Sequence, residues 1–232
     1  ADQFVEFGEK NNMFIIGHTL VWHSQTPSWV FEHKDGTPLT RNELLARMEN
    51  HITTIVKRYK GRVHGWDVVN EAVNDDGSWR ESPWYAIIGE DFIAKAFEFA
   101  HAADPDAELY YNDYNLHQPQ KADAVVELVK SIQTKGIPVT GIGMQAHYGI
   151  DYPTEEEFEA SILKFKELGI VAITELDIEV LPSPWNYMGA DVNMTAELRE
   201  ELNPYKNGLP DSVSSQLASQ YDEDNVERLL AR

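Results

Sequence analysis

The sequence predicts an α/β fold with a parallel sheet, of the kind that closes into a (β/α)₈ TIM barrel. Five apolar segments rich in β-branched residues have the length and composition of buried strands. Amphipathic segments with helical periodicity separate them, and this alternation is typical of parallel strands covered on both faces. The first strand contains Ile15 and the fifth Ile173, so each strand-to-strand interval takes about 40 residues, which suits a barrel of repeated units.

The expected elements alternate along the chain. Strands are expected at residues 13–22, 63–69, 108–112, 139–147 and 171–180. Helices are expected at residues 1–11, 42–59, 92–102, 121–131, 155–168 and 211–230. The irregular segment 181–210 is expected to be a long loop after the last strand, where loops line the active face of a barrel.

The number of strands is smaller than a closed barrel requires. Eight units of about 40 residues would need about 320 residues, whereas the chain has 232. The sequence begins and ends in expected helices, so strands are expected to be missing at both ends. We therefore expect residues 1–232 to form a single domain that is an incomplete barrel.

Composition and charge exclude several classes of function. The 39 acidic residues outnumber the 19 basic ones and give a formal net charge of −20. Such a surface repels nucleic acids and anionic lipids, so neither nucleic acid nor membrane is an expected partner, whereas a neutral carbohydrate is compatible with it. The absence of cysteine excludes disulfides, thiolate catalysis and Cys-ligated metals.

Two strand ends carry carboxylic acids. The segment 66–72 is a buried strand that ends in Asn70 and Glu71, and the segment 173–178 places Glu175 and Asp177 two residues apart, so both are expected on one interior face. Two acids at the ends of different strands suit cleavage of a glycosidic bond, in which one donates a proton and the other attacks or activates water. The alternative is that either acid is only a structural salt-bridge partner.

A third strand end carries Gln145 and His147, again two residues apart and expected on one face. His147 is expected to form a hydrogen bond with Glu175 or Asp177. Another polar strand end is the segment 110–115, which is rich in tyrosine and includes Tyr114. Its aromatic side chains suit a sugar ring, although a tyrosine-rich strand edge is the alternative.

The first strand contributes His18 and Trp22, four residues apart and therefore expected on one face. His23 is interpreted as a satisfied core histidine. His18 and His23 are expected to point to opposite faces, and no pair of histidines at helical spacing supplements them, so no metal site is expected. Neither calcium-loop spacing nor a phosphate-binding glycine loop is present, and no cofactor is expected.

Five segments of the sequence resemble glycoside hydrolase family 10: residues 17–25, 66–72, 111–115, 141–147 and 174–177. They occur in the order of the family's motifs and are long enough to be highly specific. The resemblance implies a (β/α)₈ barrel and retaining hydrolysis of internal β-1,4 bonds in xylan, a reaction that uses two glutamates and no cofactor. Xylan and xylo-oligosaccharides are the implied substrates.

The resemblance also implies a role for each matching residue. Glu71 would be the general acid/base and Glu175 the nucleophile. Asn70 would bind the 2-hydroxyl of the nucleophile-side sugar, and Tyr114 would contact the leaving-group side. The shell around the nucleophile-side sugar would consist of His18, Trp22, Gln145 and His147, with Asp177 orienting His147.

The sequence departs from the family pattern at both ends. An early strand with an amide-and-lysine cluster and a final strand with tryptophans are absent, so the chain is expected to cover about strands 3–7 of the barrel. A carbohydrate-binding module inserted within the barrel would account for the late start, and an attached or inserted module of this kind is an expected partner. The resemblance further implies a secreted, periplasmic or cell-surface enzyme, although residues 1–4 show no signal peptide.

Two other functions are compatible with the same residues. Because paired carboxylates do not select the sugar, a related barrel acting on cellulose or mannan is one alternative. An inactive barrel fragment that only binds xylan is the other, and the missing strands keep this alternative open. Intact Glu71 and Glu175 argue against the inactive fragment.

Overall fold

A computed structural model describes residues 1–149 and 152–179. These residues divide into two units, one of residues 1–147 and 153–176 and another to which residues 148–149, 152 and 177–179 belong. The first unit contains the sheet and the helices described below. The loop predicted at 181–210 and the helix predicted at 211–230 lie outside the described residues.

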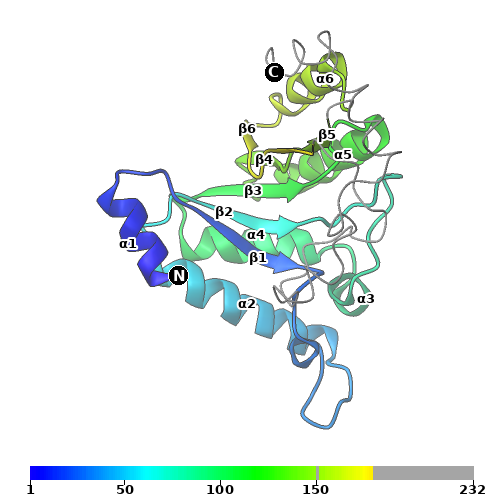
Figure 1. The fold of residues 1–232 in the computed structure, drawn as a ribbon. Coiled ribbons are helices and arrows are strands. Elements are labelled where there is room, and N and C mark those ends of the chain that lie inside the picture. Colours follow the sequence, from blue (N-terminus) through cyan, green and yellow to red (C-terminus); the bar gives the residue numbers. More distant parts are fainter. Residues whose placement is uncertain (150–151, 180–232) are drawn as a thin grey trace, which may run out of the picture. The chain divides into compact units, whose positions relative to one another are not determined.

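The first unit is built on a five-stranded parallel sheet whose strands follow in chain order (Figure 1). Its strands are β1 (Ile16–Trp22), β2 (Gly65–Asn70), β3 (Glu108–Asp113), β4 (Gly141–Met144) and β6 (Ile170–Ile173). Every residue of β2 is buried, whereas β6 is partly exposed along its length. Parallel strands in sequential order need crossover helices between them, which is the α/β arrangement that the sequence predicts.

Helices connect the strands at or near the predicted positions. They are α1 (Asp2–Lys10), α2 (Arg41–Arg58), α4 (Phe92–Ala103), α5 (Pro119–Thr134) and α6 (Glu155–Phe165). Two short elements were not predicted, namely the 3₁₀ helix η1 (Ser28–Val30) and α3 (Pro83–Ile88). The helix α3 has a local cause, because Ser82 caps its first turn and Pro83 occupies its first position.

The two longest crossover helices before β3 bury apolar faces against the sheet. A capping box between Thr40 and Glu43 starts α2, whose buried residues recur at helical spacing. Helix α4 places Phe97 and Ala100, both fully buried, in the same core. Figure 1 shows α2 and α4 on one side of β1 and β2. The core therefore holds the first three strands from that side and fixes the positions of their carboxyl ends.

The predicted strands 139–147 and 171–180 are wrong in extent. The first ends at Met144, and a separate strand β5 (His147–Gly149) follows; the second ends at Ile173, and β7 (Asp177–Glu179) follows. Strands β5 and β7 form their own two-stranded sheet. Ala146 has a left-handed backbone with φ of 65°, which turns the chain out of the extended conformation. Gln145 and His147 therefore do not belong to one strand, and the expectation that strand alternation places them on the same face is wrong.

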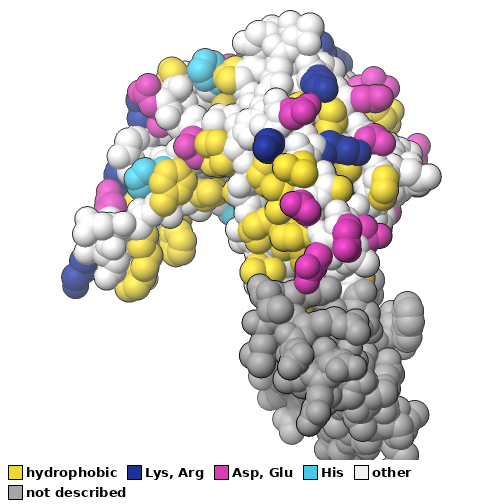
Figure 2. Space-filling view, turned by 90° about the horizontal axis from the view of Figure 1, so that it is seen from above, with side chains coloured by type: hydrophobic (Ala, Val, Ile, Leu, Met, Phe, Trp, Pro, Cys, Tyr) yellow, Lys and Arg dark blue, Asp and Glu magenta, His cyan; other side chains and the backbone are white. Residues whose placement is uncertain are grey.

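The surface carries the negative charge that the composition requires. Figure 2 shows acidic side chains at several separate places on one face, with hydrophobic side chains between them. The acidity of this face is thus distributed rather than gathered into one patch. Among the described residues, no helix is both long enough and apolar enough to cross a membrane.

Candidate active site

The carboxyl ends of the strands bring polar side chains into one row. Trp22 on β1 pairs in register with Asn70 on β2, which pairs with Asn112 on β3, which in turn pairs with Gly143 on β4. Parallel strands present their carboxyl ends at the same edge of the sheet, so the residues just beyond this row also meet there. Glu71 lies immediately after β2, and Glu175 follows two residues after β6.

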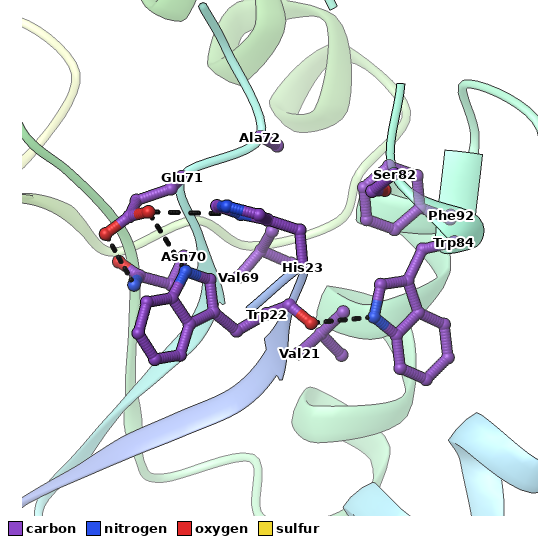
Figure 3. A pocket seen from close by; sticks show the side chains of 10 residues that line it. All are labelled: Val21, Trp22, His23, Val69, Asn70, Glu71, Ala72, Ser82, Trp84 and Phe92. Atoms are coloured by element: carbon purple, nitrogen blue, oxygen red, sulfur yellow. Dashed lines mark hydrogen bonds and ion pairs between the residues drawn. The ribbon is translucent and has the colours of Figure 1, made fainter. Parts of the chain in front are cut away.

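Glu71 is surrounded by three hydrogen-bond donors. The Trp22 indole Nε1 donates to Oε2 at 3.0 Å, and the Gln145 Nε2 donates to Oε1 at 2.9 Å. The Asn70 Nδ2 also donates to Oε1, at 3.2 Å (Figure 3). The Glu71 side chain is only 13% exposed. A nearly enclosed carboxyl group with fixed donors is a strong candidate for chemistry.

Glu175 has two partners of different kinds. Its Oε1 accepts a hydrogen bond of 3.0 Å from the Asn112 Nδ2. Its Oε2 lies 3.2 Å from the Nε2 of His147. The Glu175 side chain is 33% exposed, so it is accessible to a ligand while its orientation is fixed from two sides.

Three buried amides connect the two glutamates. The Asn70 Oδ1 accepts hydrogen bonds from the Gln145 Nε2 at 3.1 Å and from the Asn112 Nδ2 at 3.0 Å. Gln145 also binds Glu71, and Asn112 also binds Glu175. All three amides are nearly inaccessible to solvent. Such a network in a water-poor environment fixes the two carboxylates relative to each other.

Asn112 is a site residue that the sequence analysis did not identify. It is fully buried, and its Oδ1 accepts a hydrogen bond of 2.8 Å from the Thr174 hydroxyl. Gly143, its partner on β4, leaves room for it, because a Cβ on Gly143 would lie 2.3 Å from the Asn112 Oδ1. The available signal was this glycine, since glycine within a strand often marks the close approach of another group.

His18 approaches the site from β1, with its Nδ1 2.9 Å from Oδ2 of the buried Asp67. This hydrogen bond raises the pKa of His18. Burial lowers that pKa, whereas the charges of Asp67, Glu175 and Glu71 raise it further. His18 therefore tends toward the protonated form beside the two glutamates. Asp67 is a second residue that the sequence analysis did not assign to the site.

The interpretation of His23 as a satisfied core histidine is wrong. Its Nδ1 lies 3.9 Å from Oε2 of Glu71 (Figure 3) and has no hydrogen-bond partner among the described residues. Burial and the charge of Arg80 lower the pKa of His23, which favours the neutral imidazole. Because β1 ends at Trp22, the alternation of strand side chains does not apply to His23.

A pocket lies beside Glu71 and is bounded by polar and apolar groups (Figure 3). Trp22 and His23 line it together with Trp84, whose indole Nε1 donates a 2.9 Å hydrogen bond to the Trp22 carbonyl oxygen. The remaining lining residues are Val21, Val69, Asn70, Glu71, Ala72, Ser82 and Phe92. Trp84 thus holds the backbone of the residue whose indole binds Glu71.

Tyr114 is connected to Glu71 through Arg80. The Arg80 Nη2 donates a 2.8 Å hydrogen bond to the Tyr114 hydroxyl, and the Arg80 Nε donates one of 2.8 Å to the Glu71 carbonyl oxygen. The Lys121 Nζ lies 3.6 Å from the centre of the Tyr114 ring. The structure therefore places Tyr114 on the β3 side of Glu71. Arg80 is another residue that the sequence analysis missed.

Asp177 is the first residue of β7 and belongs to the second compact unit. Its expected role in orienting His147 stays a prediction. The expectation that Glu175 and Asp177 share one face of a single strand is wrong, because Glu175 lies between β6 and β7. Within residues 1–149 and 152–179, no group of three or more acidic or histidine side chains could hold a metal ion.

Two carboxylates fixed by one set of buried amides at the carboxyl edge of a parallel sheet form the arrangement expected of a glycoside hydrolase. Comparison with known families leads to the same class. The model of glycosyl hydrolase family 10 matches residues 1–218. The chain therefore belongs to glycosyl hydrolase family 10.

Individual relatives agree with this assignment. An endo-1,4-beta-xylanase A from Xylanibacter ruminicola is 51% identical over 222 residues, which are 95% of this chain and 60% of that protein. An endo-1,4-beta-xylanase from Geobacillus stearothermophilus is 56% identical over 200 residues, 81% of this chain and 60% of that protein. The chain thus spans about three fifths of the length of each relative.

A solved structure confirms the predicted fold class. A family 10 endoxylanase retrieved from a sugarcane soil metagenome is 48% identical and superimposes with a TM-score of 0.78, covering 99% of this chain and 65% of that one. The five parallel strands of the described residues are therefore strands of a (β/α)₈ barrel.

Proposed function

We propose that this chain is the catalytic region of a retaining endo-1,4-β-xylanase that cleaves internal bonds of xylan and xylo-oligosaccharides. The observation that carries the proposal is the network of Asn70, Asn112 and Gln145, which holds Glu71 and Glu175 at one site. Both relatives described above carry the name endo-1,4-beta-xylanase. The names support the choice of sugar, which paired carboxylates alone do not make.

In the first step, a Glu175 oxygen forms a bond to the anomeric carbon while the bond from that carbon to the leaving oxygen breaks. Glu71 transfers its proton to the leaving oxygen, so that a neutral alcohol departs. Asn112 and His147, which contact the two Glu175 oxygens, hold the carboxylate in the direction of attack. The product is a glycosyl ester on Glu175.

In the second step, Glu71 is an anion and takes a proton from water as the water oxygen attacks the anomeric carbon. The ester bond to Glu175 breaks, and the carboxylate returns with the configuration of the sugar retained. The donors around Glu71 suit this role, because Trp22 and Gln145 bind its two oxygens from different sides. A fixed carboxyl group serves as acid and then as base without moving far.

Residues around the two glutamates are assigned to the sugars. We infer that His18, Trp22, Asn70, Gln145 and His147 contact the sugar on the nucleophile side. Four of them form hydrogen bonds to Glu71 or Glu175 and so lie at the cleavage site, and the family resemblance is what assigns them to this side. Tyr114 is assigned to the leaving-group side, since it joins Glu71 through Arg80. Export from the cell and a carbohydrate-binding module stay predictions.

Release of reducing ends from soluble xylan, carboxymethyl cellulose and mannan by the 232-residue chain tests the proposal. Xylan should be hydrolysed fastest, with short oligosaccharides appearing from within the polymer. Faster turnover of cellulose or mannan would contradict the choice of substrate. Binding of xylan without any release of reducing ends would instead favour the inactive barrel fragment.

A further inference from the structure

Glu71 has an unusual backbone conformation. Its φ is +56°, in the left-handed region that residues with a β-carbon seldom occupy. Such a conformation persists only when surrounding groups hold it, and at functional sites it commonly aims a side chain. The groups that bind the backbone of Glu71 and Ala72 should therefore influence where the Glu71 carboxyl group points.

Hydrogen bonds hold every backbone polar group of Glu71 and Ala72. The Glu71 N–H donates to the Asn112 carbonyl oxygen at 2.9 Å, and the Ala72 carbonyl oxygen accepts from the Arg80 N–H at 2.9 Å. The peptide group between the two residues is held by side chains on both sides. Its oxygen accepts from the Arg80 Nε at 2.8 Å, and its N–H donates to the Tyr111 hydroxyl at 3.0 Å.

Tyr111 is itself held by a buried ion pair. It is fully buried, and its hydroxyl donates a 2.6 Å hydrogen bond to Oδ2 of Asp113. Oδ1 of Asp113 lies 2.9 Å from the Nζ of Lys121, and neither of these side chains is exposed. Burial raises the pKa of Tyr111 well above its usual range. The hydroxyl therefore keeps its proton and can accept from Ala72 while it donates to Asp113.

A second connection runs from the same ion pair to the other side of the peptide. The Lys121 Nζ packs 3.6 Å from the centre of the Tyr114 ring, and the Tyr114 hydroxyl accepts from the Arg80 Nη2 at 2.8 Å. Arg80 then reaches the Glu71 carbonyl oxygen. Both connections start at Asp113–Lys121 and end on the one peptide group that follows Glu71.

We propose that Tyr111, supported by the Asp113–Lys121 pair, is a positioning residue for Glu71 that fixes the plane of the Glu71–Ala72 peptide and thereby the direction of the acid/base carboxyl group. The inference rests on the proposed function, because it assigns Tyr111 to the proton-transfer steps of that reaction. Among the described residues, the Tyr111 hydroxyl forms hydrogen bonds with the Ala72 N–H and with Asp113, and none with Glu175.

The substitution Tyr111→Phe in the full chain tests this role. It removes one hydroxyl oxygen and leaves the ring volume nearly unchanged. The substrates are two aryl β-xylobiosides, one with a phenol leaving group that needs protonation and one with a dinitrophenol that does not. For the phenol, kcat/KM should fall about tenfold to a hundredfold, a part of the roughly 10²–10⁴-fold contribution of general acid catalysis. For the dinitrophenol it should stay within about threefold.

Tyr110→Phe is a matched control on the same strand. The Tyr110 hydroxyl donates to the Glu108 side chain and not to the backbone of Glu71 or Ala72. This variant should keep the wild-type ratio of kcat/KM between the two substrates. If Tyr111→Phe does not fold, as judged by circular dichroism, Arg80→Lys tests the other side of the peptide and should show the same selective loss.

A purely structural role predicts a different result. A folded Tyr111→Phe or Arg80→Lys variant that loses the same factor on both substrates, or loses nothing, overturns the inference. Azide adds a second readout, because it attacks the glycosyl enzyme without needing a base. It should raise kcat of Tyr111→Phe on the dinitrophenyl substrate and leave the control unchanged. A wild-type chain that cleaves neither substrate would overturn the proposed function together with this inference, whereas unselective losses overturn the inference alone.

Discussion

The two glutamates lie in regions of very different construction. Glu71 follows a strand that is buried at every residue, and the peptide groups on both sides of it are held by Asn112, Tyr111 and Arg80. Glu175 follows the partly exposed strand β6 and is itself 33% exposed, against 13% for Glu71. The proposed acid/base is thus held both through its side-chain oxygens and through the peptide groups on either side of it. The proposed nucleophile is held by Asn112 and His147 at its side chain and by a backbone hydrogen bond to Gln145.

This difference fits the roles proposed for the two groups. A general acid that later becomes a base has to stay aligned with two different oxygens during one cycle. A nucleophile has to reach the anomeric carbon and therefore needs open space in front of it. Substitutions should consequently act on different steps of the reaction, depending on which region they alter.

Loss of the nucleophile should have the largest effect. Glu175→Ala removes the atom that forms the covalent bond, so kcat should fall at least about 10⁴-fold on every substrate. The fold should be largely retained, because the side chain is partly exposed and lies at the edge of the core. Steady-state rates on aryl xylobiosides, with circular dichroism as the control, measure both. Substantial residual turnover would remove Glu175 from the mechanism.

Loss of the acid/base should depend on the leaving group. Glu71→Ala should lower kcat/KM for a phenol leaving group by about 10²–10⁴-fold, whereas a dinitrophenol, which departs without a proton, should be affected little. The slope of log kcat/KM against leaving-group pKa is the measurement. A slope equal to that of the wild type would show that Glu71 does not protonate the leaving oxygen.

Crowding the amide network should affect both regions at once. Gly143→Ala places a Cβ 2.3 Å from the Asn112 Oδ1, so the Asn112 side chain must shift, which disturbs its hydrogen bonds to Glu175 and Asn70. We expect a loss of about 1–3 kcal/mol in the free energy of unfolding, as for other overpacked sites. The kcat should fall by a similar factor for good and poor leaving groups, because Asn112 takes part in the network that holds both glutamates. Denaturant titration and kinetics on both substrates test this; unchanged values would mean that Asn112 adapts.

The smallest expected effect concerns His18. Its hydrogen bond to Asp67 raises its pKa, so in the folded protein it should titrate above the usual value of about 6.5. A raised folded-state pKa means that the contribution to stability is complete below about pH 6.5 and disappears as the pH rises through the folded-state pKa. NMR titration of the His18 ring measures this directly. A pKa at or below about 6.5 would contradict the pairing with Asp67.

Much of the fold could be predicted because its causes are local. Strands β1, β2 and β3 overlap the segments that their apolar and aromatic residues predict, and α2 has both a capping box and apolar residues at helical spacing. The ends of β4 and β6 could not be predicted. The left-handed conformation of Ala146 separates β4 from β5, and alanine gives no sequence signal for such a turn.

Some residues of the candidate site could be predicted from the sequence and others could not, for the same reason. Asn70, Glu71, Gln145 and Glu175 stand at strand ends and were identifiable from polarity within apolar segments. Asn112, Tyr111 and Arg80 act through partners that are distant in sequence, so no spacing rule identifies them. The environment of His23 could not be predicted, because the sequence does not show that β1 ends at Trp22, one residue before it.

The central claim is that Glu71 and Glu175 act on one sugar from the same site, with Glu175 forming the covalent bond. A 2-fluoro xylobiosyl donor with a good leaving group traps that ester, and mass spectrometry of the peptides locates it. The account predicts a label on the peptide that contains Glu175 and none on the peptide that contains Glu71. A label on Glu71, or steady turnover of the donor by an active chain with no trapped ester, would contradict it.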